Sequence, residues 1–269
     1  STLNAWKTGH WHISHTPSST TTTLIALAIM FKLGLAPMHA WYPEVVQGST
    51  MNTALIISTW QKIAPLTLLY LMNNYLPTTI MCLLGLISAL IGGWMGLNQT
   101  QTRKIMAFSS IAHMGWLIIA MSLKPPLALV TLLVYMIMTT AMFTTLNATM
   151  TKTLTDIGTT WTQSPPLTTL AVLTLMSLGG LPPLMGFTPK WLILNEMCII
   201  KLTPLALALA LASLPSLYFY IRMAYMTTIT APPHTTNTEH KWRFITSINP
   251  TLTPTTMLTI WLLPMTPLM

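Results

Sequence analysis

The stretch Gly34-Leu35-Ala36-Pro37-Met38-His39-Ala40-Trp41-Tyr42-Pro43 has a second copy in Gly180-Leu181-Pro182-Pro183-Leu184-Met185-Gly186-Phe187-Thr188-Pro189. The two copies align without a gap inside apolar stretches, and glycine, leucine, proline, an aromatic residue and proline recur at the same positions. Glycine and proline interrupt a helix, which a membrane tolerates only where protein or a water-filled cavity satisfies the freed backbone groups. Matching interruptions in two halves of a chain indicate a central ion or substrate site of a transporter. The alternative is chance recurrence, because glycine and proline are common in membrane helices.

The composition indicates an integral membrane protein. Of the 269 residues 52% are hydrophobic and only 6% are charged, with a mean hydropathy of +0.60, whereas soluble domains carry about 25% charged residues. The net charge of +8 comes from basic residues scattered singly along the chain. Nucleic-acid binding requires basic residues clustered on one face, so the sequence predicts no nucleic-acid partner.

Apolar runs long enough to cross a bilayer, or nearly so, fill most of the chain. Because lipid admits only helices and closed barrels, and strict alternation is absent, we expect an all-α, polytopic transmembrane helix bundle. The predicted spans are residues 20 to 40, 53 to 72, 78 to 97, 104 to 122, 126 to 149, 167 to 185, 187 to 201, 203 to 225 and 251 to 269. Residues 150 to 166 and 226 to 250 are expected to be polar loops within a single membrane domain, 1 to 269.

Two lysines fall in the middle of predicted spans. Lys32 and Lys62 each lie about eight or more residues, or roughly 12 Å, from either end of the span, which is too far for the side chain to reach the interface comfortably. A charge at mid-membrane costs about 2.5 to 3.5 kcal/mol on insertion scales. We therefore expect both to face the bundle interior, water or a carboxylate, where burial favours the neutral amine and makes proton exchange feasible. The alternative is a structural lysine that donates to carbonyls of a broken helix.

Three further basic residues are candidates for proton transfer. Lys190 follows the second interruption, and Lys104 begins a span, where it is either buried or reaches the interface. His113 lies near the middle of the same span as Lys104, on one helical face with Ser109. Histidine exchanges protons near neutral pH, but a hydrogen-bonded histidine in a packed bundle explains it equally well.

The acidic residues lie near the expected ends of spans. Glu44 is expected to cap the following helix or to pair with a basic residue, and Glu196 is either an intramembrane carboxylate or lies where its span ends beside Lys201.

Other catalytic chemistry is missing from the sequence. There is no phosphate-binding loop, no cysteine cluster for iron and sulfur and no nucleotide-binding fingerprint, so we expect no cofactor on this chain. Cys82 and Cys198 lie in apolar stretches and do not predict a disulfide framework. His10 and His12 have the spacing of metal ligands, but no carboxylate or cysteine accompanies them, which favours a solvated loop over a metal site.

Four blocks of sequence together resemble the NADH-ubiquinone oxidoreductase chain 2 family, the mitochondrially encoded, antiporter-like membrane subunits of respiratory complex I. The blocks are residues 32 to 48 (KLGLAPMHAWYPEVVQG), 60 to 65 (WQKIAP), 96 to 116 (GLNQTQTRKIMAFSSIAHMGW) and 177 to 191 (SLGGLPPLMGFTPKW). The resemblance runs in order over essentially the whole chain.

The resemblance implies a proton channel with two inverted repeats of five helices, each with one broken helix. It implies that Lys32, Lys62, Lys104 and Lys190 lie along a hydrated axis and pass protons when quinone is reduced elsewhere in the complex. Flavin, iron-sulfur clusters and ubiquinone are then bound by other subunits. It also implies further N-terminal helices, absent from this sequence, one of which carries a glutamate that pairs with the lysine at position 32.

The sequence therefore predicts a proton-translocating subunit of NADH:ubiquinone oxidoreductase, multi-pass in the mitochondrial inner membrane. Its expected partners are other membrane-arm and accessory subunits and membrane lipids. Two alternatives remain: a free-standing cation/proton antiporter, and a structural scaffold whose lysines serve only assembly.

Overall fold

A computed structural model of the chain describes residues 2–9, 11, 19–163, 165–229 and 250–261. These residues form helices and one 3-10 turn, η1 (Asn73–Tyr75), with no strand beyond an isolated antiparallel bridge between Gln101 and Thr153. The all-α prediction is confirmed. The helices are α1 (Thr2–Thr8), α2 (Ser19–Leu33), α3 (Trp41–Gly48), α4 (Met51–Ser58), α5 (Trp60–Leu71), α6 (Thr78–Gly96), α7 (Thr102–Leu123), α8 (Pro125–Thr149), α9 (Leu154–Gln163), α10 (Pro165–Gly179), α11 (Phe187–Ile199), α12 (Thr203–Ile229) and α13 (Leu252–Trp261).

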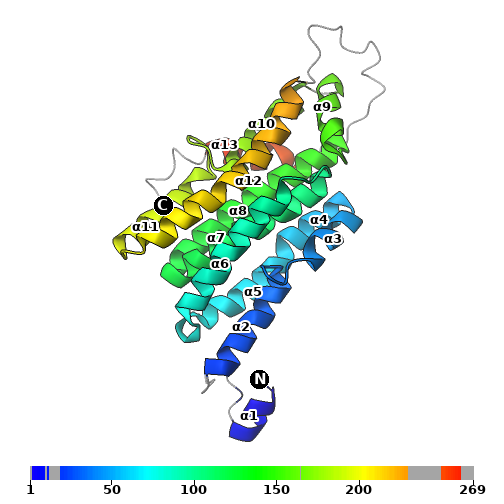
Figure 1. The fold of residues 1–269 in the computed structure, drawn as a ribbon. Coiled ribbons are helices and arrows are strands. Elements are labelled where there is room, and N and C mark those ends of the chain that lie inside the picture. The colour runs from blue at the N-terminus through cyan, green and yellow to red at the C-terminus, as the bar shows by residue number, and fades with distance from the viewer. Residues whose placement is uncertain (1, 10, 12–18, 164, 230–249, 262–269) are drawn as a thin grey trace.

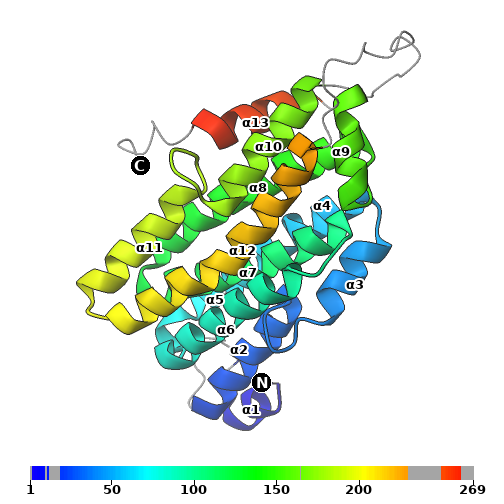
Figure 2. The same ribbon diagram turned by 45° about the horizontal axis from the view of Figure 1, so that its top comes forward.

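The long helices run side by side, as Figures 1 and 2 show from two directions. Among the described residues five segments are long and apolar enough to cross a membrane: α4 with α5, α6, α7, α8 and α12. The most apolar window of α7 is 89% buried, against 39% for α6 and 33% for α12. Helix α7 is therefore the centre of the bundle, and α6 and α12 are outer helices.

Glycines allow α6 and α7 to pack backbone against backbone. A Cβ atom on Gly115 of α7 would meet Ser88 Oγ and would lie 2.6 Å from the carbonyl oxygen of Gly85. A Cβ atom on Gly92 of α6 would lie 2.7 Å from the amide nitrogen of Ala112. Small residues at such positions are the usual way in which membrane helices approach closely, since lipid provides no hydrophobic force between them.

Threonines inside the helices bond to their own backbone. In α8 the hydroxyl of Thr139 donates to the carbonyl of Tyr135 at 2.9 Å, that of Thr144 to Thr140 at 2.8 Å, and that of Thr145 to Met142 at 2.7 Å. Each acceptor lies three or four residues earlier in the same helix, so these polar groups are satisfied without any partner helix.

The two copies of the repeated stretch have the same local structure. Helices α2 and α10 end one residue before Gly34 and Gly180, and these glycines have φ of 75° and 79°. Gly34 N donates to Phe31 O and Leu35 N to Met30 O, and the corresponding bonds join Gly180 to Ser177 and Leu181 to Met176. This pair of bonds is a Schellman motif, which requires a left-handed residue that glycine supplies without strain. The next helices, α3 and α11, begin at the aligned aromatic residues Trp41 and Phe187, which confirms one broken helix in each half.

Several predicted spans end at the wrong place. The span 20 to 40 is wrong beyond residue 33, because the Schellman motif at Gly34 ends α2 and α3 follows as a separate helix. The span 53 to 72 is divided at Thr59, whose φ of −113° and ψ of −75° depart from helical values. Of the span 251 to 269, residues 262 to 269 lie outside the described residues.

The polar loops were also incompletely predicted. The segment 150 to 166 contains α9, which buries Leu154 and Ile157 and lies at one end of the bundle beside α10 and α12 (Figure 2). Its first turn has a capping box: Thr153 N donates to Asp156 Oδ2 at 2.8 Å and Asp156 N to Thr153 Oγ1 at 3.3 Å. Of the segment 226 to 250, α12 extends to Ile229, and residues 230 to 249 lie outside the described residues.

Candidate functional site

Lys62 lies inside the protein, as the sequence predicted. It is 3% exposed, and its ammonium nitrogen donates to the hydroxyl of Tyr135 on α8 at 3.1 Å. The same nitrogen lies 4.8 Å from the ring centre of Tyr42 and 5.1 Å from that of Tyr135. Aromatic faces attract a cation most strongly where water is excluded, so the two rings compensate part of the cost of burying this charge.

The break between α4 and α5 places Lys62 and supplies a carbonyl beside it. The amide of Lys62 donates to Thr59 O, three residues back, and so leaves the carbonyl of Ser58 without its helical partner. The hydroxyl of Tyr135 donates to this carbonyl at 2.9 Å. Tyr135 thus satisfies a backbone group that a membrane interior would otherwise leave unpaired.

His113 lies on the central helix α7, between tyrosines of two neighbouring helices. Its Nε2 is 3.4 Å from the hydroxyl of Tyr220 on α12, and its ring centre is 5.9 Å from that of Tyr135. His113 and Tyr135 line a cavity of about 20 Å³, together with Trp116, Thr131, Met138, Gly186, Pro189, Lys190 and Ile193. A cavity of this size has room for one water molecule, and His113, Thr131, Tyr135 and Lys190 supply the polar groups of a wall that is otherwise apolar.

Lys190 reaches the same cavity from the second broken helix. It lies in the first turn of α11, and its ammonium nitrogen donates at 2.9 Å to the carbonyl of Gly179, the last residue of α10. The final carbonyls of a helix have no backbone donor, so a cation is favoured there. A Cβ atom on Gly180 would lie 2.9 Å from Lys190 Nζ. Gly180, which follows the last residue of α10 and forms its Schellman motif, therefore also makes room for the lysine.

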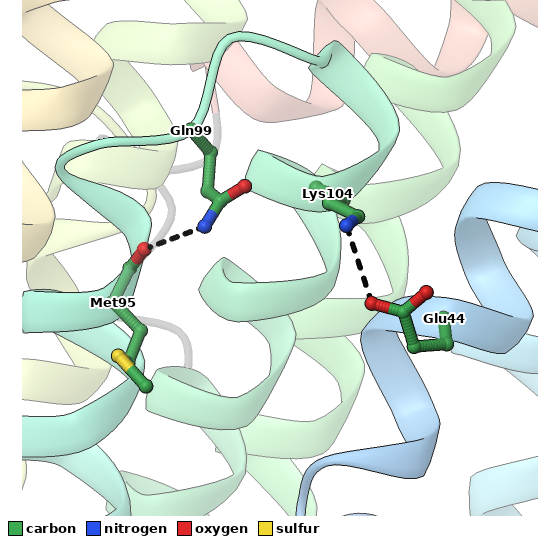
Figure 3. A network of polar contacts seen from close by, with 4 residues as sticks. All are labelled: Glu44, Met95, Gln99 and Lys104. Atoms are coloured by element: carbon green, nitrogen blue, oxygen red, sulfur yellow. Dashed lines mark hydrogen bonds and ion pairs between the residues drawn. The ribbon is translucent and has the colours of Figure 1, made fainter.

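Lys104 is paired with Glu44 at the edge of the bundle. Figure 3 shows Lys104 of α7 and Glu44 of α3 facing each other, with Lys104 Nζ 3.2 Å from Glu44 Oε1. In the same view Gln99 Nε2 donates to the carbonyl of Met95 near the end of α6. This distance confirms the expected pairing of Glu44 with a basic residue. The side chain of Lys104 is 23% exposed and that of Glu44 is 69% exposed, so the pair lies at the surface of the described bundle.

Lys32 does not face the interior of the described bundle. It is the last residue but one of α2 and is exposed, beside the exposed Phe31. The prediction that Lys32 lies in the middle of its span was wrong, because the helix ends at Leu33 rather than continuing to residue 40.

A second ion pair lies at the far end of the helix that carries Lys190. Lys124 Nζ, just before α8, lies 2.7 Å from Oε2 of Glu196, in the last turn of α11. Helix α11 ends three residues after Glu196, so this carboxylate is close to the end of its helix, as one of the two expectations stated.

The structure therefore brings three of the five predicted residues together. His113 and Lys190 line the same cavity directly. Lys62 is connected to that cavity through Tyr135, which bonds to the Lys62 ammonium and also lines the cavity. Tyr42, Tyr135 and Tyr220 were not predicted as site residues. For Tyr135 and Tyr220 the available signal was a tyrosine within a long apolar helical run, which also describes a tyrosine at the membrane interface. Tyr42 lies in the repeated stretch itself, at the second residue of α3.

The described residues include no group of three or more histidine, cysteine or acidic side chains that could hold a metal ion. His10 and His12 lie outside the described residues. Cys82 and Cys198 are both free thiols.

Two broken helices with matching glycine caps, around a buried lysine, a half-buried lysine, a histidine and phenols, define an antiporter-like membrane subunit. A family model described as "NADH:quinone oxidoreductase/Mrp antiporter, TM" matches residues 4–217, and one described as "NADH dehydrogenase subunit 2 C-terminus" matches residues 217–269. The chain belongs to the NADH-ubiquinone oxidoreductase chain 2 family.

Relatives and a solved structure agree with this assignment. The chain is 50% identical over 268 residues to NADH-ubiquinone oxidoreductase chain 2 of Carassius auratus, covering 99% of this chain and 77% of that protein. It is 47% identical over 268 residues to the same protein of Gallus gallus, covering 100% of this chain and 78% of the relative. A chain of respiratory complex I from Thermus thermophilus has the same fold, with a TM-score of 0.81 and 24% identity over 95% of this chain and 60% of that one.

Proposed function

We propose that this protein moves protons across the membrane along Lys62, His113 and Lys190, as a membrane-arm subunit of NADH:ubiquinone oxidoreductase. The observation that carries the proposal is the continuous polar region between the broken helices. Lys62 contacts Tyr135, and Tyr135, His113 and Lys190 line one cavity large enough for water. Three proton-exchanging groups on three different helices are costly to bury and are a mark of proton relays.

Lys104 and Lys32 belong to the same proposal in different places. Lys104 lies in the first turn of α7, the helix that carries His113, and is paired with Glu44. We propose that the charge of this pair influences protonation of the first group of the route. Lys32 faces away from the described bundle and is proposed to meet a carboxylate that lies outside the described residues.

Charge on one lysine affects the next through electrostatic repulsion. Two unit charges about 8 Å apart repel by about 2 kcal/mol at an effective dielectric constant of 20. Arrival of a proton at one basic group therefore favours loss of a proton from its neighbour, which is how charge moves in steps along such a row.

The remaining parts of the complex follow from the family. We propose that the chain lies in the mitochondrial inner membrane, in contact with other membrane-arm and accessory subunits and with lipid. Flavin, iron-sulfur clusters and ubiquinone are proposed to belong to other subunits. Native electrophoresis of mildly solubilised membranes, with peptides of this chain identified by mass spectrometry, should place it in a large band that oxidises NADH. A small band without that activity would instead favour a free-standing cation/proton antiporter.

The route is tested by replacing Lys62 with methionine in the assembled complex. In sealed vesicles, Lys62→Met is expected to lower the number of protons moved per electron, because the variant removes the buried ammonium while keeping an apolar side chain of similar length. The matched control is Lys152→Met, since Lys152 is an exposed lysine in the connection before α9. Equal proton stoichiometry in the two variants would contradict the proposal. If Lys62→Met reduces only the amount of complex, and not pumping per complex, Lys62 is a scaffold residue.

A further inference from the structure

Tyr135 both accepts a hydrogen bond from the Lys62 ammonium and lines the cavity of His113 and Lys190. Its hydroxyl has one hydrogen and can accept further bonds. That hydrogen points to the carbonyl of Ser58 at 2.9 Å, and the oxygen accepts from Lys62 Nζ at 3.1 Å. The hydroxyl therefore connects Lys62 to a backbone carbonyl.

The Ser58 carbonyl holds the hydroxyl in an unproductive direction. A peptide carbonyl accepts a hydrogen bond but does not take up a proton in water or in a protein near neutral pH. While the Tyr135 hydroxyl donates to Ser58, Lys62 cannot pass a proton through it, because the oxygen has no outlet for its own hydrogen. The carbonyl is free for this bond because of the break between α4 and α5.

We propose that the Tyr135 hydroxyl is a switch between Lys62 and the cavity that contains His113 and Lys190. In the closed position the hydroxyl donates to Ser58 O. In the open position it turns about its C–O bond and donates into the cavity. This inference rests on the proposed route through Lys62 and adds to it the group that opens and closes that route.

The proton balance of the open position is simple. The ammonium of Lys62 gives one proton to the oxygen of Tyr135, while the original hydroxyl proton leaves to a water molecule in the cavity or to the His113 ring. Lys62 becomes a neutral amine, tyrosine remains neutral, and the cavity group gains the positive charge. Rotation back to Ser58 O then closes the switch behind the proton.

Tyr218 of α12 offers a control for this role. It is 60% exposed and does not line the cavity. Tyr218→Phe and Tyr135→Phe make the same chemical change, the loss of one phenolic hydroxyl, but only Tyr135→Phe removes the hydrogen bonds to Ser58 O and from Lys62 Nζ.

The experiment compares Tyr135→Phe, Tyr218→Phe and Lys62→Met in the assembled complex in sealed vesicles, with protons per electron measured per amount of complex. We expect Tyr135→Phe to lower proton stoichiometry to the level of Lys62→Met, and Tyr218→Phe to remain at the wild-type value. If Lys62→Met is impaired while Tyr135→Phe pumps normally, the switch is wrong and the route stands. If both phenylalanine variants fall equally, the loss does not come from the hydrogen bonds that join the Tyr135 hydroxyl to Lys62 and Ser58, and the switch is again wrong. If Lys62→Met pumps normally, the route itself fails.

A second measurement applies if Tyr135→Phe prevents assembly. Infrared difference spectra of complex with isotope-labelled tyrosine, at rest and during NADH oxidation, should contain a phenol C–O band that shifts when the hydroxyl leaves Ser58. That band should disappear in Lys62→Met, which has no proton to pass. A tyrosine spectrum that does not change between rest and turnover would overturn the switch.

Discussion

At the scale of single residues, Asp156 shows how one carboxylate begins a helix. Its Oδ2 accepts from the backbone amides of Thr153 at 2.8 Å and Lys152 at 3.1 Å. The Thr153 amide first, then its hydroxyl and the Lys152 amide, hold the pKa of the Asp156 carboxyl below its ordinary value. Because these donors favour the charged form, the first turn of α9 depends on ionised Asp156.

The pH dependence of this turn follows from the direction of the shift. A carboxyl whose pKa is lower in the folded state contributes stability above its unfolded pKa of about 3.9 and loses it as pH falls through the folded value. Amide protection of Lys152 and Thr153, measured by hydrogen exchange and corrected for intrinsic rates, should therefore stay constant between pH 7 and 5. Asp156→Ala should lose that protection already at pH 7. Protection that falls between pH 7 and 5 would show that Asp156 does not hold the turn.

The residue scale also explains which site residues could be predicted. The cost of a charge in lipid made Lys62 recognisable in the sequence, and the repeated interruption made Lys190 recognisable. Lys62 is buried, and Lys190 is half-buried with its ammonium against the carbonyl of Gly179. Lys32 satisfied the same rule but is exposed, because α2 is apolar on all sides and its sequence does not show which side packs against the bundle. Tyr135 could not be singled out, since its role depends on the Ser58 carbonyl, 77 positions away in the chain.

At the scale of elements, the close contact between α6 and α7 fixes the central helix. Gly115→Val is expected to separate these helices, since even a Cβ atom would meet the Gly85 carbonyl at 2.6 Å. The amount of assembled complex on native gels should fall several-fold, because overpacking a tight contact costs about 1 to 3 kcal/mol or more. The matched control is Gly48→Val at the end of α3, where a Cβ atom meets nothing within 4 Å. Equal amounts of complex for the two variants would show that the α6 and α7 contact is not essential.

The elements missed from the sequence were short and partly polar. Helices α3 and α9 have 8 and 10 residues, too few for a search that looks for runs of about 20 apolar residues. The residues Thr153 and Asp156 do have the spacing of a capping box, which would have indicated the start of α9. The two broken helices were predictable because glycine and proline mark an interruption directly, and because the same interruption occurs twice.

At the scale of the whole molecule, Lys32 indicates a surface that must be covered. It is exposed beside Phe31 in the apolar helix α2, where a charge that faces lipid without a partner is unfavourable. When the chain is produced without its partner subunits, Lys32→Leu should therefore increase the amount inserted in the membrane. Lys62→Leu should decrease it, because Lys62 has its partners within the bundle. In the complete complex Lys32→Leu should instead lower proton pumping.

Membrane extracts analysed by protease protection and quantitative mass spectrometry measure the inserted amount. If Lys32→Leu and Lys62→Leu change it in the same direction, the exposed and buried lysines are not distinguished by their partners, and the covered surface is not at Lys32.

Exposed threonines bond to their own helix in the same way as the buried threonines of α8. Thr67 of α5 donates to Ala64 O at 2.8 Å and Thr169 of α10 to Pro166 O at 2.9 Å, which has a consequence for how the outer surface of the molecule can change. A threonine whose hydroxyl donates to its own helix presents lipid with a surface similar to that of valine, because its polar hydrogen is already bonded. Hydropathy indices still count such a residue as polar, so they underestimate how apolar the lipid-facing surface of these helices is. Exchange among threonine, valine and isoleucine on the lipid-facing sides should then be nearly neutral, and the sequence of that surface is free to drift while the glycine-capped breaks are not.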